Sequence, residues 1–202
     1  MSTLASSAFA IRTLVRDVRG VAGMQFAFIA PLLVFLFLGV VAAFDATRAG
    51  RQAAMTAVTM SDLATRVIDM DDLQRDAFFN VSNALMSRWG DTSSTFSVSI
   101  TSVINPVEDD PSDPEVTEEV VWSEASVDGY EVETADLAQF DLPPIVEGAS
   151  LILVEVRGSY IPKFAAMGLP TQIDMKRTSV RRPRFVSEVV YLDAQGNPVD
   201  DD

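Results

Sequence analysis

Residues 21–44 form one uncharged, strongly apolar run, and this run constrains the fold of the chain more than any other feature. In it, Gln25 is the one strongly polar side chain. A helix needs about 20 apolar residues to cross the hydrocarbon core of a bilayer. A helix buried in a soluble core is normally interrupted by polar residues every few positions. The run therefore predicts a single transmembrane helix over residues 21–44.

The charges around the run predict its orientation. Arg12, Arg16 and Arg19 precede it against one acid, Asp17, and the chain beyond it is strongly acidic. Positive charge near a span stays on the cytoplasmic side. We therefore expect a cytoplasmic N-terminus and an exported remainder, which in a bacterium places the anchor in the inner membrane and the C-terminal domain in the periplasm. A cleaved secretory signal ending near residues 41–43 is the alternative, but its apolar region would span only about 7–15 residues.

The composition excludes several classes of function. The chain has 15 basic and 29 acidic residues, a net charge of -14, although 48% of its residues are hydrophobic. Such acidity argues against a nucleic-acid partner, because phosphate binding needs a high density of cations. The chain has no Cys and no His. Disulfides, thiolate or imidazole metal ligands and Ser-His or Cys-His relays are thereby excluded. We expect no cofactor and no enzymatic activity.

A short motif lies where the basic leader, residues 1–20, meets the apolar run. The leader ends in Gly20, Val21 follows, and Gln25 and Phe26 come shortly after. This arrangement resembles the cleavage site of type IV prepilin-like proteins, which a prepilin peptidase cuts after the glycine. The resemblance implies a mature N-terminus at Val21 and places Gln25 where that family usually has Glu. A helix-flanking glycine followed by an incidental glutamine is the alternative interpretation.

A longer resemblance surrounds this motif. Residues 19–39 (RGVAGMQFAFIAPLLVFLFLG) are similar to the N-terminal segment of the TadE/TadG-like family, the minor pseudopilins of the tight-adherence (Flp-type) pilus. Residues 26–28 (FAF) and Pro31 fall where that family has them. Residues 154–162 and 178–184 are similar to the family's C-terminal strand pair. The resemblance implies a non-enzymatic protein that primes or caps pilus assembly. Its partners would be the prepilin peptidase, other minor pseudopilins or pilins, the inner-membrane pilus assembly platform and the lipid bilayer.

Residues 45–90 are expected to be helical in two pieces. Along the first piece, mostly small residues recur on one helix face: Ala46, Gly50, Ala53, Ala57, Met60, Ala64 and Val67. We expect the outer part of this face to pack on the chain's own head, with packing against the helices of other pilins as the alternative. The acidic residues 69–72 predict a break and an N-cap, and Gly90 predicts the end of the second helix.

Residues 91–192 are expected to form an α+β head, followed by a loose acidic tail over residues 193–202. Residues 95–101 alternate between apolar and polar side chains, which predicts a half-buried antiparallel strand. Further strands are expected at 119–125, 151–160, 171–182 and, as an edge, 185–192, with a short helix at 134–140 capped by Thr134. Together these elements predict an antiparallel sheet of about four strands packed on the outer helix.

The charge of the head is divided between two regions. Sixteen acids and no basic residue lie between Trp89 and Val156. Residues 157–184 carry seven basic residues and one acid, Asp174. We expect the basic residues to balance acids within the sheet. A basic docking edge for an acidic neighbour is the alternative.

The acidic stretch contains a candidate calcium loop formed by Asp109, Asp110, Asp113 and Glu115. Carboxylate oxygens suit this cation, but the loop lacks the alternating acids and the glycine of a calcium-binding loop. We therefore expect a solvated surface loop. A calcium site would favour the alternative function, that of a membrane-anchored or secreted periplasmic ligand-binding or adhesin module.

Overall fold

The computed structural model describes residues 19–87, 95–107, 118–162 and 171–199, with side chains from residue 21 onward. Several sequence-based expectations fall outside these residues: the leader arginines Arg12 and Arg16, the helix end at Gly90, and the candidate calcium ligands Asp109, Asp110, Asp113 and Glu115.

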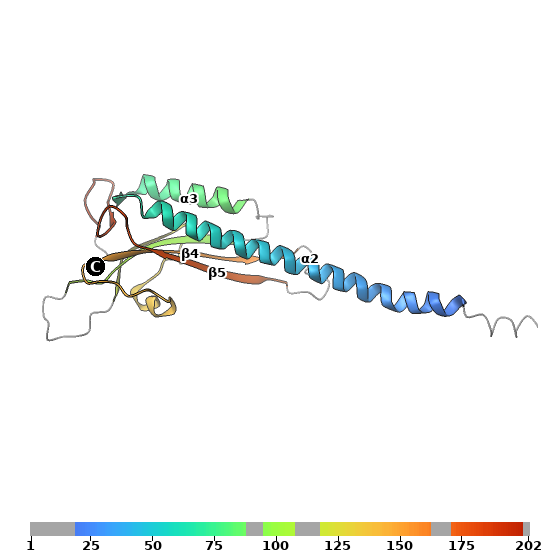
Figure 1. The fold of residues 1–202 in the computed structure, drawn as a ribbon. Helices are drawn as coiled ribbons and strands as arrows, with labels where there is room; N and C mark the ends of the chain where they lie inside the picture. The colour runs from blue at the N-terminus through green and yellow to red at the C-terminus, as the bar shows by residue number, and fades with distance from the viewer. Residues whose placement is uncertain (1–18, 88–94, 108–117, 163–170, 200–202) are drawn as a thin grey trace, which may run out of the picture.

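A single long helix, α2 (Arg19–Ala64), dominates the structure (Figure 1). Its 46 residues correspond to a rod about 69 Å long. The helix continues through Pro31, although proline lacks the N–H that would bond to the carbonyl four residues earlier. We call residues 21–44 the apolar segment and the described residues from 45 onward the head. The apolar segment extends away from the head, so one helix joins the two parts.

The head contains a four-stranded antiparallel sheet with the strand order β3-β2-β4-β5. Its strands are β2 (Thr95–Ile104), β3 (Glu119–Ala125), β4 (Ser150–Tyr160) and β5 (Ile173–Arg181). The sheet packs against α2, which confirms the predicted α+β class and the four-stranded sheet (Figure 1). β2 and β4 form the centre of the sheet, and β3 and β5 form its edges.

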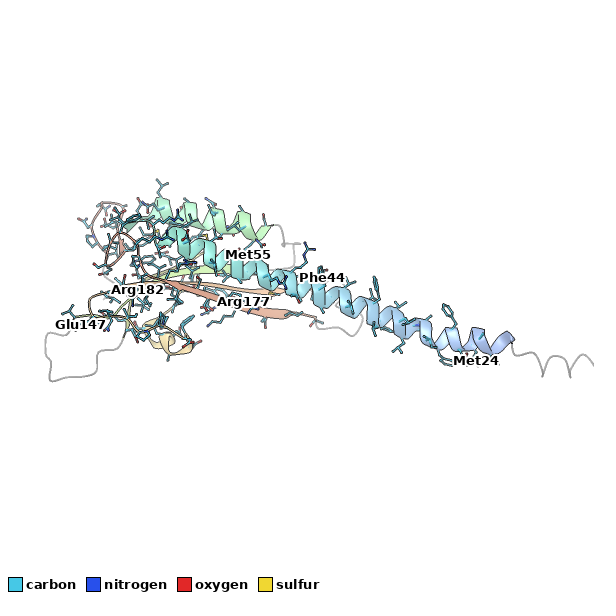
Figure 2. All side chains as sticks on the ribbon, in the orientation of Figure 1. Met24, Phe44, Met55, Glu147, Arg177 and Arg182 are labelled. Carbon is cyan, nitrogen blue, oxygen red and sulfur yellow. The ribbon has the colours of Figure 1, made fainter. Side chains whose placement is uncertain are left out.

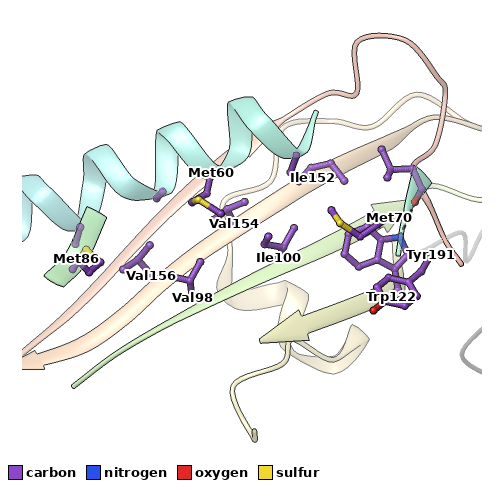
Figure 3. Close-up of a cluster of buried hydrophobic side chains, with 14 residues drawn as sticks. Met60, Met70, Met86, Val98, Ile100, Trp122, Ile152, Val154, Val156 and Tyr191 are labelled. Carbon is purple, nitrogen blue, oxygen red and sulfur yellow. Dashed lines mark hydrogen bonds between the residues drawn. The ribbon is translucent and has the colours of Figure 1, made fainter. Parts of the chain in front are cut away.

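The outer half of α2 covers one face of the sheet, with α3 (Asp72–Ser87) beside it. The predicted small-residue face is largely buried, and Ala53, Ala57 and Met60 have no exposed surface. They meet Val98 and Ile100 of β2, Ile152, Val154 and Val156 of β4, and Met86 of α3 (Figure 3). The expectation that this part of the helix packs on its own head is therefore confirmed. The predicted break is confirmed as well, because α2 ends at Ala64 and α3 begins at Asp72. Asp71 is the N-cap of α3, since its Oδ1 accepts a hydrogen bond from the backbone N–H of Gln74 at 2.7 Å.

The antiparallel strand predicted at residues 95–101 is present as β2, but the prediction that one of its faces is exposed is wrong, because the opposite face of the sheet is also covered. Ser97, Ser99 and Thr101 on β2 are buried although they point away from α2. The connection between β3 and β4 contains the 3-10 helix η1 (Thr134–Gln139) and forms a second core on that face. That core contains Val103, Val132, Leu137, Ile145, Leu151 and Leu153. Polar side chains are accommodated beneath it by local hydrogen bonds, such as the one between Thr101 and Ser123 at 2.8 Å.

Three local predictions need correction. Thr134 does not cap η1, because its hydroxyl accepts a hydrogen bond from the backbone N–H of Val120 instead. The expected edge strand at 185–192 is reduced to β6 (Val190–Tyr191), which pairs in parallel with β1 (Asp69–Met70) and not with the main sheet. The described part of the tail is not loose, because Val199 packs on the core and Asp193 accepts backbone hydrogen bonds from Gln195 and Asn197.

Candidate functional site

More than half of the exposed large hydrophobic side chains in the described part of the chain lie in the apolar segment. Thirteen of its large hydrophobic side chains are exposed, and Phe28 is the most exposed of them at 77%. Burying one such side chain stabilises a protein by about 1.5–3 kcal/mol, so water is an unfavourable surrounding for this surface. Among the described residues, one helix, Val21–Ala64, is long and apolar enough to cross a membrane, and its most apolar window is 0% buried. The segment is therefore compatible with a single-pass membrane anchor.

The processing and pilin-motif residues lie at the N-terminal end of this segment, away from the head. The described part of the chain begins at Arg19 and Gly20, of which the structure places the backbone within α2. Val21, Gln25 and Phe26 follow on the same helix, and all three are exposed. Val21 and Gln25 are four residues apart, so they share one face of the helix. Pro31 is exposed further along the same helix. None of these side chains contributes to the core of the head.

The head contains a buried ionic cluster, which the sequence reasoning did not identify as a unit. Glu155 lies in the middle of β4 and is 1% exposed. Its two carboxylate oxygens accept hydrogen bonds from Arg157 Nε at 2.6 Å and Arg157 Nη2 at 2.7 Å. Lys176 Nζ lies 3.1 Å from the same carboxylate and 4.3 Å from the centre of the Phe140 ring. The hydrogen bonds to Glu155 raise the pKa of Arg157 above its ordinary value.

A pocket of about 420 Å³ opens beside this cluster. Arg157, Lys176, Tyr130 and Gln172 contribute to its wall. Ser97, which also lines it, is 4% exposed, and its hydroxyl has no hydrogen-bond partner in the described part of the chain. A buried hydroxyl without a partner is costly, and a polar ligand or an ordered water in this pocket would remove that cost.

Two other basic residues of the C-terminal region, Arg181 and Arg184, pair with α2, whereas Arg182 Nη2 donates to the carbonyl of Pro144 in the acidic stretch at 3.2 Å. Asp62, near the end of α2, forms ion pairs with Arg66 at 2.5 Å, with Arg181 at 4.0 Å and with Arg184. The backbone N–H of Arg184 also donates to the carbonyl of Thr65 at 3.0 Å. These contacts join the end of the helix to the segment that follows β5. The hydrogen bond from Arg66, together with the nearby arginines, holds the pKa of Asp62 below its ordinary value of 3.8, against a smaller opposing effect of burial.

This lowered pKa predicts a specific pH dependence of stability. The Asp62 carboxylate stabilises the folded chain at pH values above its ordinary pKa, and this contribution is lost as the pH falls through the lower pKa of the folded state. We expect the free energy of unfolding to fall less steeply between about pH 5 and pH 3 in Asp62→Asn than in the wild type. Urea unfolding at a series of pH values measures both slopes. Equal slopes would contradict the assignment of Asp62 to this ionic contact.

No group of three or more His, Cys, Asp or Glu side chains is placed to hold a metal ion in the part of the chain that the structure describes. The candidate calcium ligands lie outside that part. No protein-family model matches the chain, and comparisons with curated proteins and with solved structures find no match.

Proposed function

We propose that the chain is a minor pseudopilin of a tight-adherence pilus system, anchored in the bacterial inner membrane with its N-terminus in the cytoplasm and its head in the periplasm. It carries out no reaction of its own. It is processed after Gly20 by a prepilin peptidase and then joins other minor pseudopilins or pilins at the assembly platform, where it primes or caps the pilus.

The observation that carries the proposal is the continuity of α2 from the motif to the core of the head. The motif residues, the exposed apolar segment and the buried face at Ala53 and Ala57 belong to one helix. A cleaved secretory signal would remove most of that helix, whereas cleavage after Gly20 would keep both its apolar segment and its packing. The similarity of residues 19–39 to the TadE/TadG-like family agrees with retention of the helix.

The proposed processing predicts a defined N-terminus. In the native host, mass spectrometry of the membrane-extracted protein is expected to find Val21 as its first residue. Gly20→Ala is expected to leave the leader attached, because the peptidase recognises the glycine before the cut. Gly23→Ala is the matched control, since a methyl group at Gly23 meets no atom within 4 Å and Ala is a better helix former.

Three results would count against the proposal. Normal processing of Gly20→Ala would show that Gly20 is not the cleavage site. A wild-type terminus near Phe44 would indicate a cleaved secretory signal, and an intact leader in the native host would contradict pseudopilin processing. Impaired processing of Gly23→Ala would show that the effect of Gly20→Ala is not specific to the cleavage site.

The pocket beside Glu155 favours a second candidate function, that of a membrane-anchored or secreted periplasmic ligand-binding or adhesin module. Its unpartnered Ser97 hydroxyl and the nearby Arg157 and Lys176 suit a small polar ligand. A thermal-shift screen of the full-length chain against small polar ligands and calcium tests this candidate. Stabilisation that Ser97→Ala abolishes would support ligand binding in the pocket, and the absence of any stabilising compound would count against it.

A further inference from the structure

A second pocket, of about 460 Å³, lies between α2 and β5 at the point where α2 leaves the apolar segment. Figure 2 shows Phe44 on the helix and Arg177 on the adjacent strand at this junction. Its wall includes three residues of α2 and three of β5: Thr47, Gly50, Arg51, Asp174, Met175 and Arg177.

The pocket carries two guanidinium groups that are not neutralised by the head. In the described part of the chain, neither Arg51 nor Arg177 forms an ion pair with a carboxylate, and both side chains are exposed. Arg177 Nη1 donates only to the backbone carbonyl of Lys176, at 2.8 Å. The one acid in the wall, Asp174, accepts a hydrogen bond from Gln172 at 2.6 Å. The wall therefore has two cations and one anion.

Gly50 leaves the space on α2 that the Arg177 guanidinium occupies. A Cβ atom on Gly50 would lie 3.3 Å from Arg177 Nη2 and 3.9 Å from Met175 Sδ. The absence of a side chain at Gly50 thus lets the Arg177 guanidinium lie close to the backbone of α2. Since Arg51 is the next residue on the helix, the two positive charges border the same pocket.

The position of the pocket along α2 indicates its depth relative to the bilayer. Asp45 is the first charged residue after the apolar segment, so the hydrocarbon boundary lies near Phe44. The pocket wall runs along α2 from Ala46 to Ala54, which is from about 3 Å to about 15 Å beyond Phe44 along the helix axis. The headgroup layer is about 5–8 Å thick on each side of the hydrocarbon. Arg48, whose guanidinium lies 5.6 Å from the centre of the Phe44 ring, adds a further cation at this level. The end of the pocket nearer the apolar segment, at Ala46 and Thr47, therefore lies at the depth of the lipid headgroups, and Gly50 and Arg51 lie just beyond that layer, on the side of the head.

We propose that this pocket binds the phosphate headgroup of an anionic phospholipid from the leaflet that faces the head. Guanidinium groups pair with phosphate oxygens through two parallel hydrogen bonds, and the nearby bilayer keeps the lipid concentration high. A bound headgroup would hold the head at a set height and rotation above the membrane. The inference rests on the membrane anchor of the proposed function, and does not depend on the pilus role.

The test uses the full-length chain in a neutral detergent. The protein is incubated separately with phosphatidylglycerol, phosphatidylcholine or inorganic phosphate, and native mass spectrometry measures what stays bound. We expect preferential retention of phosphatidylglycerol and about thirtyfold weaker retention by Arg51→Gln/Arg177→Gln, since two arginines at about 1 kcal/mol each contribute about 2 kcal/mol at an anionic surface. The matched control is Arg66→Gln/Arg182→Gln, which removes the same charge from exposed arginines outside the pocket.

Each alternative result overturns the lipid site. Equal retention of the two lipids would show that the pocket does not select an anionic headgroup. An equal loss in the control variant would show that the overall charge of the head, and not the pocket, retains the lipid. Phosphate binding that needs Arg51 and Arg177, without retention of lipid, would identify a soluble phosphate ligand instead. Flotation of the full-length chain with vesicles tests the anchor separately. A chain that floats but does not discriminate between the lipids would overturn the pocket alone.

Discussion

Gly158→Ala is expected to destabilise the head by about 3 kcal/mol, because the central strands leave no room for a side chain there. Gly158 on β4 lies directly opposite Phe96 on β2. An added Cβ would overlap the Phe96 ring and lie 2.6 Å from the backbone carbonyl oxygen of Thr95. The ring can rotate, but the carbonyl belongs to the β2 backbone and cannot move without disturbing the β2–β4 pairing. Urea unfolding of the full-length chain in detergent measures the loss.

Two variants show whether this crowding is the cause. Gly23→Ala changes the same residue type in the apolar segment, where the new methyl group meets no atom within 4 Å, so the stability of the head should not change. Adding Phe96→Ala to Gly158→Ala should recover only part of the loss, because the overlap with the Thr95 carbonyl remains. A Gly158→Ala chain as stable as the wild type would contradict the described register of β2 and β4.

Arg157→Met is expected to cost about 3 kcal/mol, because it leaves the buried Glu155 carboxylate with Lys176 as its remaining ionic partner. Glu155→Gln should cost less, about 1 kcal/mol, because it removes the buried charge itself. Its partners can then turn toward solvent, since the side chains of Arg157 and Lys176 are 29% and 42% exposed. The expected order of stability is wild type, Glu155→Gln, then Arg157→Met.

The double variant Glu155→Gln/Arg157→Met isolates the interaction between the two side chains. We expect it to be more stable than Arg157→Met alone, because no buried charge is left without its partner. Additive losses in this cycle would mean that the two residues act independently. Such a result would mean that the ionic cluster does not explain how a buried glutamate is accommodated in the middle of β4.

The elements that the sequence predicted well are those with a strong local pattern. The spacing of small residues on α2 and the alternation on β2 arise from the geometry of a helix and a strand, which repeats every few residues. Asp71 as an N-cap depends only on the next three residues. The same holds for the apolar segment, whose length and lack of charge are visible without any partner.

The errors concern contacts between residues far apart in the chain. β6 is two residues long and pairs with β1 across more than a hundred residues, so no local pattern could identify its partner. The buried second face of β2 depends on the β3–β4 connection, in which the local pattern predicted a short helix at 134–140 but not its packing on the sheet. Trp122 illustrates the same point, since its indole N–H donates to the carbonyl of Val189 at 2.7 Å from a different part of the fold.

The sequence by itself determined that this chain has one long apolar helix, a motif at its start and an α+β head, because hydrophobic periodicity and charge are properties of neighbouring residues. The tertiary structure alone decided the partners of the charged residues. The β4–β5 register places Arg157 opposite Lys176, which brings both to Glu155. The packing of α2 on β5 gathers Arg51 and Arg177 around one pocket. These charges meet through strand register and helix packing, which depend on the whole core.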